Sequence, residues 1–168
     1  MGFSDSYVRK GHPILFGLIV FFSLVEGIIA AWLVARYLQH HNYPSIAVRD
    51  RARFLLFASS WTFFLFIFMI VAFKRFTDTP MASVGTHVAL LGLTWIFWTA
   101  GAASITAALG GGYNCSTIDF LLVYCNQLVS LEAFAWTVWS LMTIALAVVL
   151  FTAIRARQRG DGFGGALA

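Results

Sequence analysis

The feature that most constrains the fold is a set of four long apolar segments. They run from about Pro13 to Leu38, Phe54 to Phe73, Val84 to Leu109, and Val129 to Ile154. A helix needs about 20 apolar residues to cross a bilayer, at about 1.5 Å of rise per residue, and each segment meets that length. None of them alternates polar and apolar residues as the strands of a membrane barrel do. The sequence therefore predicts an all-α membrane protein, an antiparallel four-transmembrane-helix bundle.

Composition excludes the main soluble classes. The chain is 60% hydrophobic and 11% charged, whereas a soluble domain has about 25% charged residues. Aromatic residues make up 17%, which excludes a disordered chain, since such chains have few aromatics. The net charge of +4 is modest and sits at segment ends, so no nucleic-acid partner is expected. The first apolar segment exceeds the ~7–15 residues of a cleaved signal peptide, so we expect it to be retained.

The polar and glycine-rich connections define the predicted organisation. We expect a cytoplasmic N-terminus over residues 1–12, the four-helix domain over 13–155, and a flexible cytoplasmic tail over 156–168. Gly110, Gly111 and Gly112 are expected to end the third helix, because glycine readily adopts the backbone conformation that terminates helices. Four spans place both termini on one side, and that side has more basic residues than the other, which predicts that it is cytoplasmic. The basic residues on that side are Arg9, Lys10, Lys74, Arg75, Arg155, Arg157 and Arg159.

Two cysteines lie in the third connection, on the predicted outer side. Cys115 and Cys125 are separated by nine residues, and the oxidising compartment favours a disulfide between them. The alternative is a membrane redox enzyme, which requires a closer pair such as Cys-x-x-Cys and a second pair to relay electrons. The chain has one pair only, so we expect a structural disulfide and no enzymatic activity. Asn114 begins an N-x-Ser glycosylation motif, but its position beside the helix end and the expected disulfide disfavours modification.

Four ionisable residues interrupt or border the spans. Glu26 lies near the middle of the first, where a charge costs at least about 2.5–3.5 kcal/mol, so it should face the bundle interior. It is either a proton or ion relay or a buried carboxyl with a hydrogen-bond partner. His87, near the inner end of the third span, is expected to be an ordinary hydrogen-bonding residue. Arg53 and Glu132 lie at matching depth near the outer ends of the second and fourth spans, which predicts an ion pair that fixes helix register.

Small residues recur every four positions in two spans. Gly27 and Ala31 do so in the first span, and Thr99, Ala103 and Ala107 do so in the third. Such rows let helices approach closely. The rows are therefore expected at helix interfaces, either within one bundle or between protomers.

Two tryptophans, Trp95 and Trp98, lie deep within the third span, where each indole N–H needs an acceptor. The acceptor would be a hydroxyl such as that of Thr94, the Glu26 carboxyl, a lipid headgroup or a sterol. No group of His, Cys, Asp and Glu has zinc-like spacing, and no nucleophile–base pattern occurs. We therefore expect neither a metal nor a cofactor.

The pattern of spans, loops and cysteines resembles the MARVEL-domain family, and the detailed sequence motifs are similar to those of its fungal branch. The resemblance extends from about His12 to Arg155. It is carried by the runs Arg51–Phe57 into Trp61-Thr62, Leu93–Trp98, Gly110–Gly112 before Cys115, Tyr124-Cys125, and Leu131–Trp136. It implies the Cys115–Cys125 bridge and structural roles for Arg53 and Glu132. Glu26 is not required by the family pattern.

The resemblance also implies a non-enzymatic role in organising lipid microdomains or in membrane trafficking, at the plasma membrane or in secretory vesicles. The expected partners are membrane lipids, such as a sphingolipid or sterol, and further copies of the chain. Arg155, Arg157 and Arg159 are expected to attract anionic headgroups, at about 1 kcal/mol each. The alternative function is a small proton- or ion-coupled channel or transporter that uses Glu26.

Overall fold

A computed structural model of the chain describes residues 3–75, 84–111, 115 and 123–158. These residues form four helices: α1 (Phe3–His40), α2 (Ile46–Arg75), α3 (Val84–Leu109) and α5 (Cys125–Gln158). Each contains a segment long and apolar enough to cross a membrane: Ile14–His40, Ile46–Met69, Val88–Leu109 and Cys125–Arg155. The predicted all-α fold with four spanning helices is confirmed, and the protein is a multi-pass integral membrane protein.

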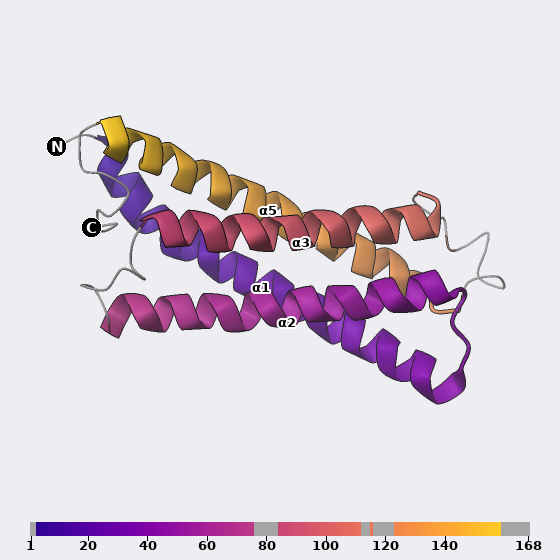
Figure 1. Cartoon of the computed structure of the whole chain (residues 1–168). Helices are drawn as coiled ribbons and strands as arrows, with labels where there is room; N and C mark the ends of the chain where they lie inside the picture. Colours follow the sequence, from indigo (N-terminus) through magenta and orange to yellow (C-terminus); the bar gives the residue numbers. More distant parts are fainter. Residues whose placement is uncertain (1–2, 76–83, 112–114, 116–122, 159–168) are drawn as a thin grey trace.

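The helices form a closed ring (Figure 1). Helix α1 packs against α2 and α5, and α3 packs against the same two helices. Consecutive helices run in opposite directions, so the start of α1 and the end of α5 lie at the same end of the bundle. Helices α2 and α5 occupy diagonal positions in this ring. That diagonal relation determines which side chains can meet.

Each helix buries one seam of residues. On α1 the buried positions follow one another at alternating steps of four and three residues, which is the heptad spacing of helices that pack side by side. The members of the α1 seam are Ile19, Ser23, Glu26, Ala30, Leu33 and Tyr37. The same alternation occurs on α5 at Leu128, Leu131, Ala135, Val138, Met142, Ala145 and Val149. The core is therefore continuous along the bundle.

Helix α2 begins eight residues before the predicted apolar segment. Ser45 caps it: the Ser45 hydroxyl accepts a hydrogen bond from the Val48 amide at 3.2 Å, and the Ser45 carbonyl accepts from the Arg49 amide at 3.2 Å. Serine at this position satisfies amides that have no partner within the helix. The segment from Ile46 to Arg53 is therefore part of the helix as well, although the predicted apolar segment begins only at Phe54.

Helix α3 ends at the predicted glycines. Gly110 and Gly111 have φ values of 72° and 90°. The Gly111 amide donates to the Thr106 carbonyl at 3.1 Å, and the Gly110 amide donates to the Ala107 carbonyl at 3.4 Å. This pair of bonds is the Schellman arrangement, which needs a left-handed residue that glycine supplies without a steric penalty.

Candidate functional site

The most unusual group in the bundle is the carboxyl of Glu26. Its side chain is fully buried on the interior seam of α1. Both carboxyl oxygens are enclosed, and neither has a hydrogen-bond partner among the described residues. The prediction that Glu26 faces the bundle interior is confirmed. The hydrogen-bond partner expected for a purely structural buried carboxyl is not found in the described part of the chain.

Helices α1 and α2 approach closely at Gly27, the residue after Glu26. A Cβ atom at Gly27 would lie 3.2 Å from the Ser59 Cβ, which is tighter than ordinary van der Waals contact. Ser23, one turn before Glu26, is fully buried, and Ser59 and Thr62 are buried on α2. Gly27 therefore serves packing within the bundle, and the buried positions of α1 and α2 next to this contact include the hydroxyl residues Ser23 and Ser59.

Two reciprocal hydrogen bonds join α2 and α3. The Trp61 indole donates to the Thr94 hydroxyl at 3.2 Å, and the Trp98 indole donates to the Thr62 hydroxyl at 2.9 Å. Each threonine hydroxyl in turn donates to a carbonyl of its own helix, Thr62 at 2.7 Å and Thr94 at 2.8 Å. The hydroxyl hydrogen is thus engaged, and an oxygen lone pair faces the indole.

The same device joins α3 and α5. The Trp95 indole donates to the Thr143 hydroxyl at 2.9 Å, and the Trp139 indole donates to the Thr99 hydroxyl at 2.8 Å. Thr99, grouped by its spacing with the small residues, is therefore a hydrogen-bond acceptor between helices. With Trp136 included, five of the six tryptophans donate to a threonine on a neighbouring helix. Every described side-chain hydrogen bond between two helices has one partner on α3.

Glu132 belongs to this network, and the predicted Arg53–Glu132 ion pair is wrong. Glu132 accepts a hydrogen bond from the Thr106 hydroxyl at 2.6 Å, and Thr106 accepts from the Trp136 indole at 3.0 Å. Arg53 instead lies 3.5 Å from Asp50 on its own helix. The physical reason is the ring order: each residue lies near the start of its helix, but α2 and α5 are diagonal and do not share a packed interface.

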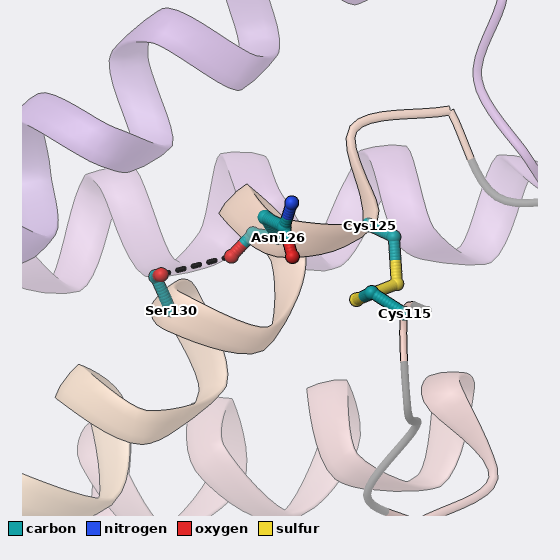
Figure 2. Close-up of a disulfide and its surroundings, with 4 residues drawn as sticks. All are labelled: Cys115, Cys125, Asn126 and Ser130. Atoms are coloured by element: carbon teal, nitrogen blue, oxygen red, sulfur yellow. Dashed lines mark hydrogen bonds between the residues drawn. A yellow bond between two sulfur atoms is a disulfide. The ribbon is translucent and has the colours of Figure 1, made fainter. Parts of the chain in front are cut away.

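The predicted disulfide is present. Cys115 and Cys125 are bonded, with their Cα atoms 5.8 Å apart. Figure 2 shows Cys125 at the start of α5, bonded to Cys115 and directly before Asn126, whose carbonyl accepts a hydrogen bond from the Ser130 hydroxyl. The bond ties the connection between α3 and α5 to the first turn of α5.

An aromatic cluster adjoins this disulfide. Tyr124 has a left-handed backbone with φ of 64°, which is uncommon for a bulky residue. Its ring lies 5.0 Å from that of Trp32 and 6.0 Å from that of Tyr37. Its hydroxyl accepts a hydrogen bond from the Asn42 side chain at 3.4 Å. Sequence reasoning did not find this cluster, because its members come from distant parts of the chain.

The remaining residues that the sequence singled out either are exposed or lie outside the described residues. Ala31, Ala103 and Ala107 lie on outward, exposed faces of α1 and α3. Arg155 is also exposed, and its guanidinium carbon lies 4.3 Å from the centre of the Phe151 ring. The described part of the chain holds no cluster of three or more His, Cys, Asp or Glu residues that would bind a metal. The side chains of His87 and Arg157, and all of Asn114, Gly112 and Arg159, lie outside the described residues.

Comparisons with protein-family models, curated proteins and solved structures gave no match for this chain. Its function is therefore argued from the bundle itself.

Proposed function

We propose that this is a non-enzymatic membrane protein that organises lipid microdomains or takes part in membrane trafficking, through lateral contacts with lipids and with further copies of itself. The observation that supports it is the division between interior and exterior. The interior seams are filled with side chains such as Trp98 and Met142, both fully buried. Every helix exposes large apolar side chains, among them Phe21, Phe64, Ile96 and Phe151. The surface available for interaction is the one that faces the membrane.

The outer face of α3 favours contact with a second copy. Its exposed positions follow one another in heptad spacing, and most of them are small: Leu93, Ile96, Ala100, Ala103, Ala107 and Gly110. Small side chains allow another helix to approach closely, and such contacts drive helix association in lipid. The row at Ala103 and Ala107 therefore supports packing between protomers, which is one of the two alternatives that the spacing left open.

The resemblance to the MARVEL family supports the same proposal. Members of that family take part in vesicle trafficking and in organising lipid-rich microdomains, and the proposed partners here are a sphingolipid or a sterol at the plasma membrane or in secretory vesicles. Arg155 is exposed near the end of α5 where the spanning segment ends, which suits attraction to anionic headgroups.

The second candidate function is a small proton- or ion-coupled transporter. The observation that favours it is the buried carboxyl of Glu26, because ionisable groups within membrane spans commonly serve transport. The test is ion flux into liposomes that contain the purified protein. Flux that disappears in Glu26→Gln would support this function, and absence of flux in the wild type would remove it.

Native mass spectrometry of the protein released from mild detergent tests the first proposal, since it reports oligomer mass and retained lipid together. We expect a defined oligomer with bound lipid. Ala103→Leu should weaken association about tenfold, which corresponds to about 1.4 kcal/mol of lost packing. Ala133→Leu is the matched control, because Ala133 is exposed on α5. A lipid-free monomer in the wild type, or equal effects of the two substitutions, would contradict the proposal.

A further inference from the structure

The bundle treats its two membrane-embedded carboxyls differently. Glu132 accepts a hydrogen bond from the Thr106 hydroxyl at 2.6 Å. Thr106 is thus unlike Thr62, Thr94, Thr99 and Thr143, whose hydroxyls donate to a carbonyl of their own helix. Glu26 receives no such donor from the described residues, although it is the more deeply buried of the two.

The buried serine and threonine hydroxyls of α1 and α2 have their hydrogens engaged in bonds to backbone carbonyls. The hydroxyls of Ser23, Ser59 and Thr62 donate to carbonyls of their own helices at 3.0, 2.8 and 2.7 Å. The Trp98 indole, a buried donor on α3, is likewise engaged, because it is bonded to Thr62. The buried hydroxyls of Ser23 and Ser59 therefore offer oxygen lone pairs but no free hydrogen.

This arrangement suits a carboxyl that carries a proton. An ionised carboxylate is acceptor-only and needs donors, whereas a protonated carboxylic acid has a hydrogen of its own to donate. A buried charge without a partner is strongly disfavoured. We propose that Glu26 is a proton-binding site within the membrane, in which the folded bundle holds the enclosed carboxyl in its protonated form.

The charged surroundings are consistent with a single proton site. The buried seam of α2 carries Ser59 and Thr62 and, among the described residues, no ionisable side chain. On α5 the nearest carboxyl is Glu132, which is already bonded to Thr106. On α1 the next titratable residue of the seam is Tyr37, about 16 Å further along the helix. No neighbouring cation among these residues would take the place of the proton.

Loss of this proton has a structural consequence. The ionised carboxylate would lack donors, so either water must enter the α1–α2 interface or the two helices must separate there. The close contact at Gly27 and Ser59 is thereby linked to pH. This inference does not depend on the proposed lateral function, which rests on the outer face of α3.

The test uses the full-length protein in lipid nanodiscs and dicyclohexylcarbodiimide, an apolar reagent that couples to protonated carboxyls. Peptide mapping by mass spectrometry locates the adduct. We expect labelling at Glu26 at neutral pH, its loss in Glu26→Gln, and its retention in the matched variant Glu132→Gln. Because glutamine is neutral and close in shape to a protonated carboxyl, Glu26→Gln should keep the helical circular dichroism of the wild type.

Infrared spectroscopy gives a second readout that does not require the reagent to reach the site. A protonated-carboxyl C=O band that is present in the wild type and in Glu132→Gln but missing in Glu26→Gln supports the proposal, even without labelling. Absence of both the adduct and such a band overturns it. Labelling that slows when Na⁺ is added at constant pH would assign the site to a metal cation and would also overturn it.

Discussion

The bond between Trp98 and Thr62 allows a quantitative test of how this bundle is held together. Both side chains are fully buried, and the indole nitrogen lies 2.9 Å from the threonine hydroxyl oxygen. Thr62→Val keeps the approximate shape of the side chain and removes the acceptor. A buried N–H left without a partner costs about 1–3 kcal/mol. We therefore expect Thr62→Val to lower the free energy of unfolding by about 1–2 kcal/mol, toward the lower part of that range.

The lower part is expected because hydrogen bonds between membrane helices are modest. Measured couplings average about 0.6 kcal/mol and reach about 1.7 kcal/mol, since the unfolded chain in the membrane also finds partners. A double-mutant cycle with Thr62→Val and Trp98→Phe should give a coupling in that range. The measurement is the loss of helical circular dichroism as sodium dodecyl sulfate is titrated into mixed micelles.

Thr137→Val is the matched control. Thr137 is exposed on α5, and its hydroxyl donates to the Ala133 carbonyl at 2.8 Å, the same local bond that Thr62 makes with Ala58. Its loss should change stability by less than about 0.5 kcal/mol. Equal effects at Thr62 and Thr137, or a coupling of zero with Trp98, would refute the view that the indole–hydroxyl bonds hold the helices together.

Two further predictions concern packing and the connection between α3 and α5. Gly101→Ala should lower the stability of the protein, because the new Cβ would lie 2.7 Å from the Leu55 Cδ2. Gly92→Ala is the control: its Cβ would meet nothing within 4 Å, so the variant should be more stable than the wild type by about 0.5–1 kcal/mol through helix propensity. Thermal unfolding of both variants tests the difference. Replacing Cys115 and Cys125 together with serine should cost about 2–3 kcal/mol, as expected for closing a loop of about ten residues, and an unfolding midpoint that does not change on adding reductant to the wild type would contradict this.

The sequence was most informative about features that depend on one helix at a time. Four apolar runs of sufficient length predicted the number of spans, and the glycines at Gly110 and Gly111 predicted the end of α3. The start of α2 at Ile46 was missed, because apolar character marks where a helix enters the membrane and not where its hydrogen bonds begin. The Ser45 cap is a local signal that would have found it.

Features that depend on two helices were predicted less well. The pair of Arg53 and Glu132 was predicted from depth, but depth alone does not say which helices are neighbours, and the ring order separates the two helices. The deep indoles of Trp95 and Trp98 were expected to need hydroxyl acceptors, yet the identity of each acceptor follows only from the packing. A signal was available: Thr94 and Trp98, and likewise Trp95 and Thr99, are four residues apart and so form two donor–acceptor faces on α3.

The concentration of hydrogen bonds on α3 has a consequence for how the helices can move. A hydrogen bond is directional and holds two helices at one axial position. Helices α2 and α5 are therefore both fixed in axial register with α3. Helix α1 meets its neighbours through its heptad seam and ring contacts such as that between Phe16 and Phe66, whose centres are 5.0 Å apart. Apolar surfaces of this kind permit small sliding motions between packed helices. Among the described residues, directional bonds thus hold α2, α3 and α5 in axial register, whereas α1, which carries Glu26, is held against α2 and α5 by side-chain packing.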